Sequence, residues 1–222
     1  MSSAFDFDPQ DPYPLASWDD CFRQAAKDHS RAVDSWLGFD LLSAEVQVRA
    51  EVNQLRFDIE TWHHLSPQIF QTSYLELRAI LHWISPEPRE CIADLGCAYG
   101  RMAFVLQRHH PESRFVGIDV CKSRLTEAQR VAQTHRLSQA IFEHVDLVIQ
   151  PDRVPKADHF FVYDIGTTQD STVLMKELSR RSFKTLVLRG GRIRHLAHQH
   201  LLPHQSPQSS LELLNLALYR FS

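Results

Sequence analysis

The spacing of hydrophobic positions changes twice along the chain and divides it into three regions. From Ala16 to about Leu65, apolar residues recur every three or four positions, which predicts amphipathic helices. From residue 91 to residue 189, short apolar runs alternate with helical stretches. After Gly190-Gly191 the spacing changes again, and Leu211–Phe221 is typical of a strand that closes a hairpin, with a helix as the alternative.

The N-terminal region has an apolar helix face that needs a partner. This face has residues spaced by four, three, four and three positions: Val48, Val52, Leu55, Ile59 and Trp62. All four tryptophans lie in the first 83 residues. We therefore expect this region to be folded and to pack on the rest of the chain, with residues 1–14 as a flexible tail because they are rich in Asp and Pro.

A second helix start is encoded at Ser73. Ser73 and Glu76 have the spacing of a capping box, in which each side chain accepts a hydrogen bond from the backbone of the other residue. Apolar residues follow at helical spacing up to Ile84, and Pro86 and Pro88 then prevent the helix from continuing.

The central region predicts a parallel sheet. Its helical stretches are 101–109, 122–135 and 170–181. Its strands are predicted at Cys91–Leu95, Arg114–Asp119, Ile141–Asp146, His159–Asp164 and Thr185–Arg189. Strands separated by helices form parallel sheets with right-handed crossovers, so we expect an α/β fold with helices on both faces.

Composition excludes several classes of function. The hydrophobic fraction of 43% supports a packed core, and the net charge of -3 argues against nucleic-acid binding through charge alone. The four cysteines form no C-x-x-C pair, and the histidines, including a tract from His195 to His204, form no H-E-x-x-H pattern, so no metal site is expected. Neither a signal peptide nor a run of ~20 apolar residues occurs, which predicts a cytoplasmic protein without a membrane partner.

The most informative segment is the turn that follows the first predicted strand, A-D-L-G-C-A-Y-G-R at residues 93–101. A tight turn from strand to helix needs residues that tolerate positive φ or let a ligand approach the backbone, and Gly96, Ala98 and Gly100 meet that need. The following helix points unpaired N–H groups at the turn, which favours a polar or anionic ligand. In a dinucleotide fingerprint the third small residue would stand at Arg101, which argues against that class.

The turn resembles the first motif of class I S-adenosylmethionine-dependent methyltransferases, in which an acid is followed by x-G-x-G-x-G. Asp94 is the acid, and Ala98 replaces the second glycine. The resemblance spans roughly residues 72–193. It implies a Rossmann-like, mostly parallel twisted sheet flanked by helices, with a C-terminal antiparallel strand and an N-terminal helical extension.

The resemblance also implies a set of cofactor-binding residues. Asp119 ends the second strand, where the family uses an acid to accept hydrogen bonds from the ribose hydroxyls. Asp146 is the corresponding candidate for the adenine amino group, and Tyr74 for the segment that reaches the methionine carboxylate. The full expected set is Asp94, Gly96, Cys97, Ala98, Gly100, Asp119, Val120, Asp146, Leu147, Asp164 and Tyr74. Simpler roles for these residues, such as helix capping by Asp94 or a turn at Asp146, remain open.

The expected reaction is methyl transfer from S-adenosylmethionine to an unidentified protein side chain or small molecule. Asp164, next to the expected transfer point, and His63 are candidates for a general base if the acceptor must lose a proton. An N-P-P-Y-type motif is absent, since D-I-G-T stands in its place, which argues against exocyclic amines and side-chain amides as acceptors. Residues 1–72 would form a substrate lid and residues 73–222 the cofactor domain. A regulatory or scaffold protein that binds the cofactor without turnover, and an NAD-dependent oxidoreductase, are the alternatives.

Overall fold

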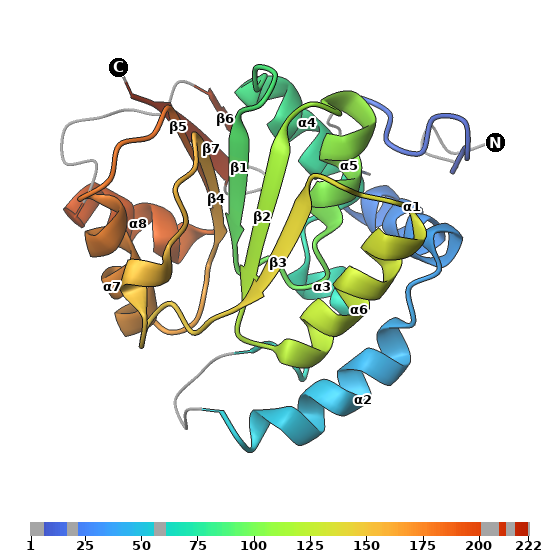
Figure 1. The fold of residues 1–222 in the computed structure, drawn as a ribbon, viewed down its shortest axis with the longest axis horizontal. Coiled ribbons are helices and arrows are strands. Elements are labelled where there is room, and N and C mark those ends of the chain that lie inside the picture. The colour runs from blue at the N-terminus through green and yellow to red at the C-terminus, as the bar shows by residue number, and fades with distance from the viewer. Residues whose placement is uncertain (1–6, 17–21, 56–60, 201–208, 212–215, 222) are drawn as a thin grey trace.

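The structure, a computed structural model, describes residues 7–16, 22–55, 61–200, 209–211 and 216–221. Its centre is a seven-stranded sheet with the order β3-β2-β1-β4-β5-β7-β6 (Figure 1). The strands are β1 (Cys91–Leu95), β2 (Arg114–Asp119), β3 (Ala140–His144), β4 (His159–Tyr163), β5 (Thr185–Arg189), β6 (Ser209–Leu211) and β7 (Leu216–Arg220).

The first five strands are parallel to one another, and β7 runs antiparallel to the two strands beside it. β1 pairs with β2 and with β4 in parallel register, and all five of its residues are buried, as expected for a strand that helices cover on both faces. β7 pairs antiparallel with both β5 and β6. The predicted fold class, including the C-terminal antiparallel strand and hairpin, is confirmed.

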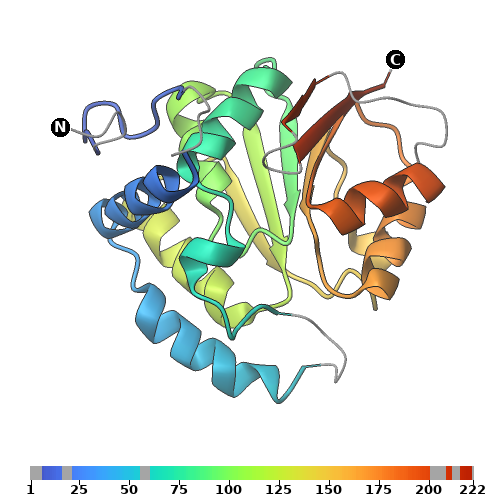
Figure 2. The ribbon, with the colours of Figure 1, turned by 180° about the vertical axis from the view of Figure 1, so that it is seen from behind.

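Helices cover both faces of the sheet and build two apolar cores (Figures 1 and 2). One core contains α4 (Tyr74–Ile84), α5 (Arg101–His109) and α6 (Lys122–Thr134), together with part of α1 (Phe22–Leu37). The other contains α7 (Thr168–Leu178) and α8 (Gly191–His200). Within the described residues, no helix combines the length and the apolar character that crossing a bilayer would require.

The N-terminal region is helical, but the single helix predicted from Val48 to Trp62 is wrong. Helix α2 (Leu41–Val52) ends at Val52, and Trp62 has a φ of 56°, which no helix residue adopts. Ile59 lies outside the described residues. The periodicity misled because the apolar residues after Val52 continue the same spacing although the helix has already ended. A short helix, α3 (Pro67–Phe70), follows and leads into α4.

Two further differences concern the ends of the chain. The expected flexible tail is wrong for its last residues, because Tyr13 is buried and stacks on Tyr74 with ring centroids 5.4 Å apart. Helix α8 was not predicted, since only three of its residues, Ile193, Leu196 and Ala197, form its buried face among arginines and histidines. Of the predicted strand from Leu211 to Phe221, residues 212–215 lie outside the description.

Candidate functional site

The turn after β1 adopts the backbone conformation that its small residues predicted. Gly96, Ala98 and Gly100 all have positive φ, at 93°, 47° and 65°. The Gly96 and Cys97 N–H groups donate to the Ile118 carbonyl of the neighbouring strand, at 2.8 and 2.9 Å. A side chain at Gly100 would place its Cβ only 2.2 Å from the Phe142 ring, so glycine is also required there for space.

Asp119, at the end of β2, connects this turn to the next one. One oxygen of its carboxylate accepts a hydrogen bond from the Ala98 N–H and the other accepts one from the Cys121 N–H, both at 2.8 Å. Each carboxylate oxygen can accept at least one more hydrogen bond. The backbone therefore fixes the orientation of Asp119 and leaves it capacity to bind a ligand with hydroxyl groups.

Asp94, at the end of β1, is buried in a small cavity beside the same turn. Gly96, Cys97, Ala98 and Asp94 all line this cavity. Burial, and to a lesser extent the nearby charge of Asp119, raise the pKa of Asp94 to about 8. Asp94 therefore keeps its proton to a higher pH than a free carboxyl group does, and the protonated form can donate a hydrogen bond as well as accept one.

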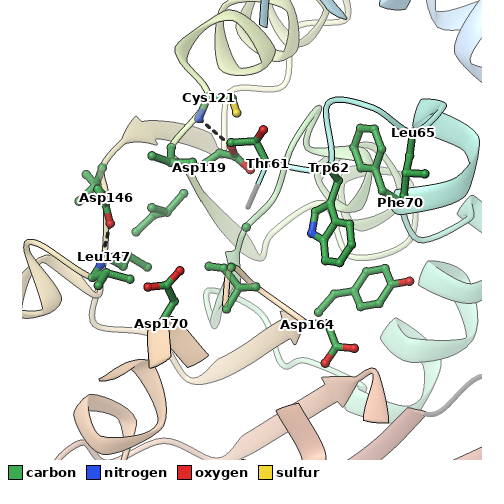
Figure 3. Close-up of a pocket in the computed structure, with 18 of the residues that line it drawn as sticks. Thr61, Trp62, Leu65, Phe70, Asp119, Cys121, Asp146, Leu147, Asp164 and Asp170 are labelled. Carbon is green, nitrogen blue, oxygen red and sulfur yellow. Dashed lines mark hydrogen bonds between the residues drawn. The ribbon is translucent and has the colours of Figure 1, made fainter. Parts of the chain in front are cut away.

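A cavity of about 220 Å³ lies over the carboxyl ends of β1, β2 and β4, where open α/β sheets bind ligands (Figure 3). One wall is apolar and includes Ile118, Val120, Val145 and Leu147. Asp119, Asp146 and Asp170 add carboxylates to the lining. The Oδ1 atom of Asp146 accepts a hydrogen bond from the Val148 N–H at 2.9 Å, so this aspartate also stabilises a turn.

The opposite wall comes from the N-terminal region. Thr61, Trp62, Leu65, Ile69 and Phe70 line the cavity from the segment that includes α3 (Figure 3). We call this segment, residues 61–70, the roof. In Figure 3, Trp62 and Phe70 lie across the cavity from Asp146 and Leu147. The roof makes the cavity narrow and apolar, which suits a flat aromatic group such as a nucleobase.

Two buried ion pairs join the N-terminal helices and the roof to α5 and α6. Arg124, in the first turn of α6, pairs with Glu45 of α2 at 2.8 Å, donates to the Thr61 carbonyl at 2.7 Å and lies 4.3 Å from the centre of the Phe70 ring. Arg101, the first residue of α5, pairs with Asp34 of α1 and donates to the Thr72 carbonyl. Sequence reasoning treated Arg101 only as an argument against dinucleotide binding and missed this role.

Asp164 lines the cavity but is committed to a structural contact. Its Oδ1 accepts a hydrogen bond from the Ile193 N–H at 2.8 Å, which caps the N-terminus of α8. A Cβ on Gly190 would lie 2.1 Å from the Asp164 carboxyl carbon, so the capping contact is tightly packed. This arrangement points the carboxylate toward α8, and a role for Asp164 as general base stays a prediction.

Two expected site residues lie away from the cavity. The Tyr74 hydroxyl donates to Asp34 at 2.8 Å, and its side chain is fully buried between α1 and α4, so it is not positioned to reach a methionine carboxylate. Nδ1 of His63 is hydrogen-bonded to the Thr61 hydroxyl at 2.9 Å, and His63 does not line the cavity.

The structure brings most of the expected residues together. The main cavity is lined by Gly96, Asp119, Val120, Asp146, Leu147 and Asp164, and the adjoining small cavity by Asp94, Gly96, Cys97 and Ala98. Sequence reasoning missed the roof, although Ser66 followed by Pro67 is a recognisable helix start. Within the described part of the chain, no group of three or more His, Cys, Asp or Glu side chains is placed to hold a metal ion.

Comparison with known proteins finds similarity to methyltransferases. Residues 92–198 match the family model of a methyltransferase domain. TrmN from Thermus thermophilus superposes with a TM-score of 0.52 at 18% identity, covering 61% of this chain and 43% of that one. Precorrin-6y C5,15-methyltransferase from Geobacter metallireducens superposes with a TM-score of 0.53 at 14% identity, covering 70% of this chain and 87% of that one. A search of curated protein sequences gave no match.

The sheet order and the small-residue turn after β1 define a Rossmann-like fold, and the family model that residues 92–198 match is that of a methyltransferase domain. The family match extends over residues 92–198, which is just under half of the chain, and it identifies this part as similar to a methyltransferase domain. The two superposed structures are too distant in sequence to show more than the fold. This chain covers less than half the length of TrmN, so the likeness to TrmN is confined to part of that protein.

Proposed function

We propose that the protein transfers a methyl group from S-adenosylmethionine to an acceptor that lies beside the main cavity. The observation that carries this proposal is the position of Asp119. Two backbone N–H groups hold this carboxylate on the wall of a cavity that is otherwise mainly apolar, at the carboxyl ends of the strands. A nucleoside offers the matching groups, an apolar base and a pair of vicinal hydroxyls.

The residues present fit the cofactor. Val120 and Leu147 provide apolar surface for the adenine ring, with the roof on the other side, and Asp119 accepts hydrogen bonds from the ribose. The methionine part would extend past Gly96 toward the small cavity beside Asp94. When bound, the cofactor supplies an electrophilic methyl group on its sulfonium. The protein then mainly has to align the acceptor and exclude water, which the roof favours.

The two alternatives make different predictions. An NAD-dependent oxidoreductase needs close helix–strand packing at the position of Arg101, and here a buried arginine paired with Asp34 occupies it. A regulatory protein would bind the cofactor without turnover. Release of labelled S-adenosylhomocysteine in the presence of small-molecule and protein acceptors supports the enzyme, whereas tight cofactor binding with no turnover on any acceptor supports the regulator.

The binding half of the proposal is tested by calorimetry with S-adenosylhomocysteine. We expect Asp119→Asn to weaken binding by more than tenfold, about 1.4 kcal/mol, because the amide accepts fewer hydrogen bonds from the ribose. Asp152→Asn, at an exposed acid in the short 3-10 helix before β4, is the matched control and should bind like the wild type. A circular-dichroism melt of each variant separates lost binding from lost folding. Equal affinities for both variants, or tighter binding of NAD than of S-adenosylhomocysteine, would contradict the proposal.

A further inference from the structure

A second cavity, of about 290 Å³, lies over the carboxyl ends of β4 and β5. Helix α1 forms one side of it through Ala26, Lys27 and Ser30, and Gly190-Gly191 forms another. Ile69, Tyr163 and Asp164 line both this cavity and the main one, so the two share a wall. A molecule in this cavity would therefore lie next to the main cavity. We call it the β4–β5 cavity.

Two residues of this lining each carry a buried hydrogen-bond donor that has no partner among the described residues. These donors are Nε2 of Gln71 and Nη1 of Arg189. The rest of the Arg189 guanidinium is held in place, since its Nε and Nη2 both donate to Glu76 and its Cζ atom lies 4.1 Å from the centre of the Tyr163 ring. Its unpartnered N–H groups therefore have a fixed orientation.

A neighbouring amide on the same lining, that of Gln68, is hydrogen-bonded at both ends. Gln68 donates to Asp34 at 2.7 Å and accepts from Arg101 at 2.8 Å, so both its nitrogen and its oxygen have a partner. A buried donor without a partner costs about 1–3 kcal/mol. Two such donors on residues that line one cavity indicate a ligand that accepts hydrogen bonds from both.

The charges on the lining limit what this ligand can be. Glu76 balances Arg189 and Asp34 balances Arg101, while Lys27 adds a positive charge and Asp164, which caps α8, adds a negative one. The cavity therefore offers several N–H donors but little net positive charge. This combination suits a group with one negative charge spread over two oxygens better than a dianion such as phosphate.

We propose that the β4–β5 cavity is the acceptor subsite, and that it binds a carboxylate of a small-molecule methyl acceptor through Gln71 Nε2 and Arg189 Nη1. This inference rests on the proposed function, since it assumes that methyl transfer takes place at the wall the two cavities share. Gln71 also lines the small cavity beside Asp94, so its amide could instead bind the carboxylate of the cofactor. The test must separate these two carboxylates.

The first experiment uses benzoate as a carboxylate probe, with benzamide as its uncharged match, titrated by NMR into protein saturated with S-adenosylhomocysteine. We expect benzoate to bind and benzamide to bind at least tenfold more weakly. Gln71→Glu, which replaces a donor with a like charge at nearly constant shape, should weaken benzoate binding by more than tenfold. Gln71→Leu should weaken it less. Gln47→Glu, the same change at an exposed position of α2, is the control and should leave benzoate binding unchanged.

The second experiment compares S-adenosylhomocysteine with 5'-methylthioadenosine, which lacks the amino-acid part. If Gln71 serves the acceptor, Gln71→Leu leaves both affinities within twofold of the wild type. A selective loss of S-adenosylhomocysteine binding would overturn the proposal, because the cofactor's carboxylate would then be the ligand. Equal binding of benzoate and benzamide, or tighter binding of inorganic phosphate than of benzoate, would also overturn it. If the wild type binds benzoate but not S-adenosylhomocysteine, the proposed function is refuted, whereas carboxylate binding in the β4–β5 cavity is supported.

Discussion

The ion pair between Arg101 and Asp34 provides the sharpest test of how the N-terminal helices are attached. Both residues are only 3% exposed. The Asp34 carboxylate accepts hydrogen bonds from two guanidinium nitrogens of Arg101, from the Gln68 amide and from the Tyr74 hydroxyl. Asp34→Asn keeps the shape of the side chain and removes its charge, so it leaves the Arg101 guanidinium in the interior without a counter-charge.

The expected loss is large for a single substitution. Removing one partner of a buried pair costs about 3–5 kcal/mol, because the remaining charge stays desolvated. The asparagine oxygen can still accept some of the hydrogen bonds, so we expect a value near 3 kcal/mol. For a chain of this length, that free energy lowers the melting temperature by roughly 6–12 °C.

The assay is urea unfolding at pH 7, followed by circular dichroism. It is applied to Asp34→Asn, to the single variants Asp34→Leu and Arg101→Met, and to the double variant that combines the last two. Asp34→Leu combined with Arg101→Met removes both charges, and we expect it to be clearly less destabilised than the sum of its single variants, since no unpaired charge remains. Glu143→Gln, at the solvent-exposed pair with Arg153, is the control and should change the free energy of unfolding by no more than about 1 kcal/mol. A loss below 1 kcal/mol in Asp34→Asn, or strict additivity in the double variant, would refute the reasoning.

Two further predictions concern the turn after β1. Ala98 has a positive φ, which strains a residue with a Cβ, so Ala98→Gly should raise the free energy of unfolding by up to about 1 kcal/mol. Ala50→Gly, on the exposed face of α2, should lower the free energy of unfolding by about as much. Urea unfolding measures both changes, and a destabilising Ala98→Gly would contradict the strain at Ala98. The raised pKa of Asp94 means that the folded state binds a proton that the unfolded state has released between about pH 4 and pH 8, so the stabilising effect of this group is lost as the pH rises through that window. Asp94→Asn should therefore gain stability relative to the wild type as the pH increases from 4 to 8, and a difference that does not change with pH would disprove the assignment.

The sheet could be predicted from the sequence because buried parallel strands are nearly continuous apolar runs. The bounds of β1, β2 and β5 agree with the prediction at both ends. The positions of Gly96 and Asp119 followed from the same pattern, since the carboxyl ends of parallel strands meet at one edge. These features are local in sequence, and local spacing was enough to find them.

The direction of individual side chains could not be predicted in the same way. Asp164 follows β4 directly, but its carboxylate caps α8, a helix whose polar sequence gave little sign of forming. Asp170, which the sequence offered only as part of a helix, lines the main cavity. The roof depends on Arg124 reaching Thr61 and Glu45, and contacts between residues so far apart in sequence leave no periodic signal.

The two arginines that anchor the N-terminal helices stand in the first turns of α5 and α6, directly after the segments that shape the cofactor pocket. The N-terminal extension is therefore not a portable module. Grafting it onto another enzyme of this class would require the recipient to carry arginines equivalent to Arg101 and Arg124. Deleting the residues before residue 66 would remove Asp34 and Glu45 and leave both arginines buried without a counter-charge. Recombination between such enzymes should succeed only when the extension and these two helix starts are exchanged as one piece.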